Sequence, residues 1–165
     1  MSASDSPGAS ERDLDVKLAV YRHFAEEARR PSPEEVSVRA GVPASDVPAA
    51  YARLRAARVL VLEEDGVSIR MAPPFSGVPT QHVAVVGGKR YFANCAWDVF
   101  GIVAALTPRA TEVGALRRPG AVESRCEQTL APLRLEIGAN GPEASSWLFH
   151  CAVPAAHWWD DIVLT

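Results

Sequence analysis

The sequence predicts an α+β fold in two parts, a helical N-terminal domain that ends in a β-hairpin and a small mixed-sheet domain. Three observations lead to this prediction. Apolar residues recur at helical spacing through the first third of the chain. Short runs of β-branched and aromatic residues, bounded by glycine and proline, dominate the rest. Between the two patterns lies a stretch rich in proline and glycine that is typical of a linker.

The first helix is expected at residues 11–30, where apolar side chains recur at helical spacing and Pro31 follows the last turn. The second helix begins after Ser32, which can cap it, with Pro33 at its first position, and Gly41 ends it. The side chains of the first helix that we expect to face the core are Leu14, Leu18, Tyr21 and Ala25, with Val20 and Phe24 beside them.

The third helix is expected from Ser45 or Asp46 to about Arg58. A strand at residues 59–62, a tight turn and a return strand at residues 67–70 follow it. Three helices followed by a β-hairpin are typical of a winged helix-turn-helix domain.

These patterns set the expected domain boundaries. They are a disordered tail at residues 1–10, a winged-helix domain at residues 11–72, a linker at residues 73–80 and the mixed-sheet domain at residues 81–165. In this second domain an apolar helix is expected at residues 94–106. The other elements expected there are strands at residues 82–86, 90–92, 110–116, 122–126, 133–137 and 146–151 and a helical turn at residues 155–161.

Charge and composition narrow the class of protein. The 165 residues carry a formal net charge of −3, which argues against a strongly basic nucleic-acid binder. Residues 1–60 hold as many basic as acidic residues, and Asp46 opens the presumed recognition helix, so DNA binding is disfavoured. The N-terminus lacks the features of a signal peptide, and no apolar run approaches the ~18 residues of a membrane span. We therefore expect a cytoplasmic protein without membrane contacts.

The chain has three cysteines, Cys95, Cys126 and Cys151, whose thiols can pack, bind metals or react. An odd count without a signal peptide argues against a disulfide framework, so we expect reduced thiols. The sequence contains no Cys-x-x-Cys pair, so it gives no strong indication of a zinc site. The other potential metal ligands are His150, His157, Asp160 and Asp161, which we interpret as a strand end and an amphipathic turn.

The sharpest local pattern is Asn94-Cys95-Ala96-Trp97-Asp98. On a helix, Cys95 and Asp98 share a face, and a cysteine in the first turn has its pKa lowered by the helix dipole. A neighbouring carboxylate can then move a proton. The alternative interpretation is a buried structural cysteine beside a surface aspartate.

Two segments resemble the core of the alkylmercury (organomercurial) lyase family, namely Phe75-Ser76-Gly77-Val78-Pro79-Thr80 and Gly87-Gly88-Lys89-Arg90-Tyr91-Phe92-Ala93-Asn94-Cys95-Ala96-Trp97-Asp98. The resemblance covers nearly the whole chain and implies the fold given above. By it, Cys95 matches the first catalytic cysteine and Asp98 the catalytic aspartate of the family. Cys126 is similar to a further cysteine that is usually structural.

The end of the chain, from Val153 to Ile162, is similar to the segment that leads into the family's second catalytic cysteine. That cysteine is expected just after Thr165, where this sequence stops. Three interpretations follow. The chain is a fragment of an ordinary lyase; or Cys151 replaces the second thiol; or the protein is a shortened relative that keeps Cys95 and Asp98 for another role.

The resemblance implies protonolysis of a carbon–mercury bond. Thiolates are the ligands that soft mercury prefers, and the aspartate protonates the carbon. Small organomercury compounds and small thiols are the expected partners, no redox cofactor is required, and Cys95 and Cys151 would hold the Hg(II) product. The alternatives are a protein that binds a thiophilic metal without turnover and a winged-helix DNA-binding regulator. The oligomeric state and the preferred organic group are not indicated.

Overall fold

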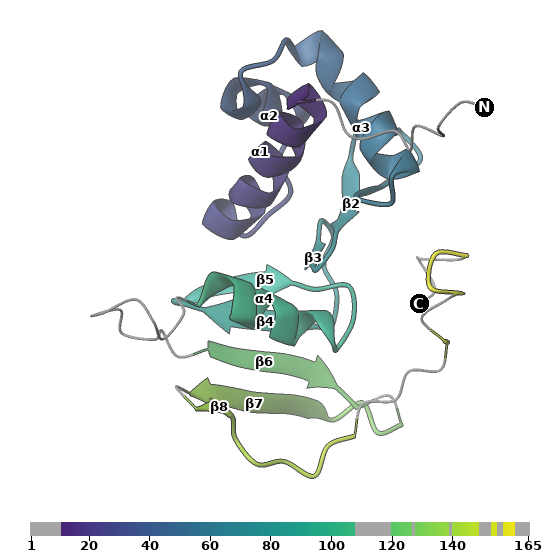
Figure 1. Cartoon of the computed structure of the whole chain (residues 1–165). Coiled ribbons are helices and arrows are strands. Elements are labelled where there is room, and N and C mark those ends of the chain that lie inside the picture. The colour runs from purple at the N-terminus through teal and green to yellow at the C-terminus, as the bar shows by residue number, and fades with distance from the viewer. Residues whose placement is uncertain are drawn as a thin grey trace, which may run out of the picture. The chain divides into compact units, whose positions relative to one another are not determined.

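The structure is a computed structural model that describes residues 11–107, 120–126, 128–138, 140–148, 153–154 and 157–160. The chain divides into two compact units, Met1–Val78 and Pro79–Thr165 (Figure 1). Both units combine helices with antiparallel strands, which confirms the α+β class.

The helices of the first unit form where the sequence predicts them. They are α1 (Glu11–Glu27), α2 (Pro33–Ala40), the short 3₁₀ helix η1 (Ala44–Asp46) and α3 (Val47–Ala56). The predicted cap of α2 is confirmed and is a full capping box. The Ser32 hydroxyl accepts from the Glu35 N–H at 3.2 Å, and the Ser32 N–H donates to the Glu35 carboxylate at 2.8 Å.

The buried face of α1 differs from the predicted one. Leu14 and Leu18 are 48% and 40% exposed, so they lie outside the core. The face that packs is Asp13, Val16, Ala19, Val20, His23 and Phe24. Asp13 and His23 can lie there because each meets a charged partner, Arg53 for Asp13 and Glu35 for His23. A prediction that counts only apolar residues therefore places the buried face of this helix on the wrong side chains, because it leaves out the buried Asp13 and His23.

A three-stranded antiparallel sheet completes the first unit. Its strands, in the order β1-β2-β3, are β1 (Val61–Leu62), β2 (Ile69–Ala72) and β3 (Phe75–Ser76). The predicted hairpin is present in a shorter form, and the Asp65 carboxylate closes its turn by accepting from two backbone N–H groups. The strand β3 lies in the segment that we expected to be a linker. The assignment of this unit as a winged helix stays a prediction.

Gly77 explains how the chain can turn away from β3 so close to β2. A Cβ atom at this position would lie 2.0 Å from the Ile69 carbonyl oxygen, well inside any tolerated contact. Only glycine allows the two backbones to approach in this way. Its N–H donates to the Arg70 carbonyl at 2.7 Å.

The second unit is built on a five-stranded sheet in the order β5-β4-β6-β7-β8 (Figure 1). Its elements are β4 (Val83–Val86), β5 (Lys89–Phe92), α4 (Asp98–Leu106), β6 (Gly120–Arg125), β7 (Pro132–Gly138) and β8 (Gly141–Pro142). Every neighbouring pair of these strands is antiparallel, so the expectation of a mixed sheet is wrong. The reason is topological, because β6 returns beside β4 and not beside β5.

The helix α4 packs on β4 and β6. A Cβ atom at Gly120 would lie 2.8 Å from the Val103 side chain, which shows how closely the helix meets β6 at that end. Val99, Ile102 and Val103 are the buried residues of α4. They form its core with Ala84, Val122 and other apolar side chains of the sheet.

The strands expected around residues 82–86, 90–92, 122–126 and 133–137 are confirmed as β4, β5, β6 and β7, whereas β8 was not predicted. Residues 146–148 form no strand, contrary to the prediction. Residues 157–160 form a turn closed by backbone hydrogen bonds. The strand expected at residues 110–116 lies outside the described residues.

Candidate functional site

The segment that carries Cys95 leaves the sheet from a fixed point. Ala93 follows β5, and its N–H donates to the His82 carbonyl at 2.9 Å. Its own carbonyl accepts from the Thr80 hydroxyl at 2.6 Å. Ala93 is fully buried. The two hydrogen bonds tie the end of β5 to the start of β4, so the next residues, Asn94 and Cys95, begin from a rigid position.

Cys95 lies before the helix and not inside it. The helix α4 starts at Asp98 with Trp97 at its N-cap, so residues 94–97 form a bend and a turn between β5 and α4. The predicted helix start at Asn94 is therefore wrong. The chain needs these residues to reverse direction, because α4 has to run back over the sheet that β5 has just left.

The turn nevertheless brings Cys95 and Asp98 together. Both side chains are half-buried, and the Cys95 thiol and the Asp98 carboxyl lie near enough for each to shift the pKa of the other. The Asp98 carboxylate also accepts from the side-chain amide nitrogen of Asn94 at 3.2 Å. The backbone N–H groups of Asp98 and Trp97 approach the Cys95 sulfur. The sequence motif thus corresponds to a compact cluster of a thiol, a carboxyl and an amide.

The electrostatics of the thiol differ from the prediction. Burial raises the pKa of Cys95, and the adjacent charge of Asp98 raises it further. The two backbone N–H groups act in the opposite direction without reversing the result. Because Cys95 lies outside the helix and is half-buried, the expected lowering of its pKa by the helix dipole is wrong.

The pKa of the Asp98 carboxyl is shifted as well. Burial raises the pKa of Asp98, while the hydrogen bonds from Asn94 and from Cys95 lower it in part. Both members of the pair therefore favour their protonated forms more than exposed groups would. A thiol that keeps its proton and a carboxyl that accepts one readily are suited to pass a single proton between them.

The other cysteines lie elsewhere. Cys126 follows β6, where its N–H donates to the Ala131 carbonyl and its carbonyl accepts from the Leu130 N–H. Its backbone closes the turn between β6 and β7, and the structural role of its thiol stays a prediction. Cys151, the candidate second thiol, and His150 lie outside the described residues.

Sequence reasoning missed a polar pair at the same end of the sheet. The His82 Nδ1 atom lies 2.9 Å from the Ser124 hydroxyl oxygen. The register pairs Val86 with Gly120 and Ala84 with Val122, so His82 and Ser124 share the face of the sheet that α4 covers. The alternation of His82, Ala84 and Val86 was the available signal.

Within the described residues, no three His, Cys, Asp or Glu side chains gather in a way that could hold a metal ion. His157 and Asp160 do meet, with the Nδ1 atom 2.8 Å from a carboxylate oxygen, but both are exposed within one turn. Asp161 lies outside the described residues, so the interpretation of this segment as an amphipathic turn stays a prediction.

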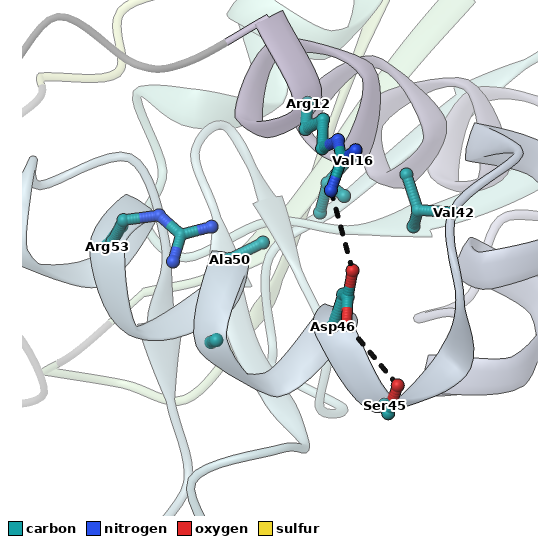
Figure 2. A pocket seen from close by; sticks show the side chains of 8 residues that line it. Arg12, Val16, Val42, Ser45, Asp46, Ala50 and Arg53 are labelled. Carbon is teal, nitrogen blue, oxygen red and sulfur yellow. Dashed lines mark hydrogen bonds and ion pairs between the residues drawn. The ribbon is translucent and has the colours of Figure 1, made fainter.

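The first unit has a hollow of about 280 Å³ between α1 and α3, shown in Figure 2. Its charged side chains already have partners. Arg53 donates to both oxygens of the buried Asp13 at 2.8 and 2.7 Å, and Arg12 lies 3.8 Å from Asp46. We therefore assign the hollow to packing between helices and not to chemistry. In the described part of the chain no helix is long and apolar enough to cross a membrane.

A comparison with curated proteins finds no match. Among solved structures the chain is similar to the mercury-bound form of MerB2, with a TM-score of 0.58 and 17% sequence identity. The match covers 83% of this chain and 60% of that one, so this chain spans well under two thirds of that protein, and the likeness shows a shared fold.

The family comparison is more specific. The model of the MerB alkylmercury lyase family matches residues 75–165, which is more than half of the chain and includes Cys95, Asp98 and Cys126. The resemblance first seen in the residues around Cys95 is thus confirmed by an independent match over the whole second unit. The chain belongs to the alkylmercury lyase family.

Proposed function

We propose that this protein cleaves the carbon–mercury bond of small organomercury compounds by protonolysis, releasing a hydrocarbon and Hg(II). The observation that carries the proposal is the contact between the Cys95 thiol and the Asp98 carboxylate inside the segment that matches the family. A soft thiolate beside a proton carrier is the pair of groups that this reaction needs.

In the first step Asp98 takes the proton of the Cys95 thiol, and the thiolate binds R–Hg⁺. The raised pKa of Cys95 makes such a local base necessary, because few thiols would ionise unaided at neutral pH. The raised pKa of Asp98 makes the carboxyl a competent acceptor. The bonds formed are O–H on Asp98 and Hg–S, and the bond broken is S–H.

In the second step Asp98 returns its proton to the carbon attached to mercury. The electron pair of the C–Hg bond becomes the new C–H bond, and mercury stays in the +2 state on sulfur. No atom is oxidised or reduced, so the step requires no redox cofactor. A second sulfur donor would push electron density toward the carbon and would hold the product ion. Cys151 or a small thiol from solution could supply it.

A second candidate function is capture of a thiophilic metal without turnover. It rests on the half-buried Cys95 thiol, which forms no disulfide and is a ligand of the kind that soft metals prefer. DNA binding by the first unit is disfavoured, because Arg53 is committed to Asp13 and Arg12 lies near Asp46. We place either activity in the cytoplasm, on the argument from reduced thiols.

The test is to incubate the purified protein with phenylmercury or methylmercury and excess small thiol, and to measure benzene or methane. Cys95→Ser and Asp98→Asn should abolish release, while Cys126→Ser should retain it if the protein folds. Loss in Cys151→Ser would identify the second thiol. Stoichiometric mercury binding through Cys95 with no hydrocarbon would favour capture. Release that survives Cys95→Ser would refute the role of Cys95, and neither release nor mercury binding would refute both functions.

A further inference from the structure

Asn94, which carries a side-chain amide, lies between Ala93 at the end of β5 and the reactive thiol of Cys95. Asn94 follows the buried and doubly bonded Ala93 and directly precedes Cys95. Its backbone position is therefore fixed by the sheet, whereas Asp98 belongs to the first turn of α4. The hydrogen bond from the Asn94 amide to Asp98, 3.2 Å long, links these two parts of the site.

We propose that Asn94 is a positioning residue that holds the Asp98 carboxyl toward Cys95 and selects which of its oxygens carries the proton. This inference rests on the proposed function. The structure gives the contact as the Asn94 amide nitrogen to Oδ2 of Asp98. An oxygen that already accepts an N–H group is a poor place for a proton, so a proton taken from Cys95 resides on the other oxygen, Oδ1.

This selection matters because proton delivery to carbon has strict geometry. The carbon to be protonated is attached to mercury on the Cys95 sulfur, so the acidic oxygen must stay within hydrogen-bond reach of that sulfur. A carboxyl at a helix start could otherwise rotate about its side-chain torsions. The amide removes that freedom from one oxygen and leaves the other for the reaction. The bond formed is C–H, and the bonds broken are O–H and C–Hg.

The test uses three substitutions that separate hydrogen bonding from size. Asn94→Leu keeps the volume but removes the donor, Asn94→Asp keeps the shape but replaces the donor with a like charge, and Asn94→Gln keeps an amide. We expect hydrocarbon release to fall about 10- to 100-fold in Asn94→Leu, further in Asn94→Asp and least in Asn94→Gln. Binding of phenylmercury to Cys95 should change little. Asn140→Ala, which removes an exposed amide beside β8, is the matched control.

A purely structural role would predict another order, with the isosteric Asn94→Asp the mildest change. That order, or an equal loss of mercury binding and of hydrocarbon release, would overturn the proposal. Circular dichroism and thermal unfolding of each variant show whether it is folded before the rates are compared.

A second readout does not depend on lyase activity. The alkylation rate of Cys95 by iodoacetamide, followed by peptide mass, reports the fraction of Cys95 that is already thiolate. It should rise in Asp98→Asn, because removal of the adjacent negative charge lowers the pKa of the thiol. Asn94→Leu should raise the alkylation rate about two- to fivefold in the natural background and should have no further effect in Asp98→Asn. An equal effect in both backgrounds would refute the positioning role. If the natural protein releases no hydrocarbon, the lyase proposal fails, while this coupling still decides the role of Asn94.

Discussion

Two carboxylates lie at the start of helices, Glu35 in the first unit and Asp98 in the second, and their pKa values are shifted in opposite directions. Glu35 accepts from the Arg29 side chain and from the Ser32 N–H, and these bonds lower its pKa to about 2. Asp98 meets an amide and a thiol, and burial raises its pKa. The first carboxylate is paired with Arg29 and caps α2. The second is left able to exchange a proton, which is the usual condition of a reactive group.

The largest effect should come from removing the exchangeable proton. Asp98→Asn should lower the rate of hydrocarbon release by about 10²- to 10⁴-fold, because the amide cannot accept the thiol proton or return it to carbon. Single-turnover release of benzene from phenylmercury is the measurement. Asp15→Asn, at an exposed position of α1, is the matched control and should leave the rate unchanged. Similar rates in both variants would mean that Asp98 does not carry the proton.

The ion pair between Arg53 and Asp13 should contribute to the stability of the protein and not to the reactivity of Cys95. Arg53→Ala leaves the carboxylate of Asp13, which is 3% exposed, without its bidentate partner. We expect the free energy of unfolding to fall, by less than the full cost of a broken buried pair because Arg53 is half-exposed. Urea unfolding measures this change, and the alkylation rate of Cys95 should not follow it. Arg55→Ala, on the exposed side of the same helix, should cost under about 0.5 kcal/mol.

The smallest effect should be the contribution of Glu35, and it depends on pH. Its pKa is lowered in the folded state from 4.5 to about 2, so its ion pair and cap stabilise the protein above the unfolded pKa. That contribution is lost as the pH falls from about 4.5 to about 2. Because the side chain is 37% exposed, we expect under about 1 kcal/mol. The melting temperatures of the natural protein and of Glu35→Gln should differ at pH 7 and converge at low pH; a constant difference would contradict this.

The comparison also shows what could be predicted from sequence. The cap at Ser32 depends on residues three positions apart, so the local sequence contains all of it. The buried face of α1 depends on Arg53, forty positions from Asp13, which a periodicity of apolar residues does not include. The strands β4 and β5 were predicted because Gly87 and Gly88 mark the turn between them.

The sequence predicted which residues form the candidate site but not the direction in which the pKa of Cys95 is shifted. Cys95 and Asp98 were identified from the motif and its resemblance to a family, and the structure brings them into contact. The start of α4 and the raised pKa of Cys95 were missed, because both follow from how the sheet anchors Ala93 and buries the next residues. Asn94 was identified only as part of the motif and as the first residue of the expected helix. Its bond to Asp98 required the turn geometry.

The hydrogen bond from Thr80 to Ala93 also sets where the second unit can be cut. Thr80 is only the second residue of that unit, yet its hydroxyl holds the strand end from which Cys95 extends. A fragment beginning at residue 81 would keep every strand of the five-stranded sheet and lose this tether. A fragment beginning at Pro79 would keep both. Two residues at the junction therefore separate a piece that preserves only the scaffold from one that also preserves the shape of the reactive turn.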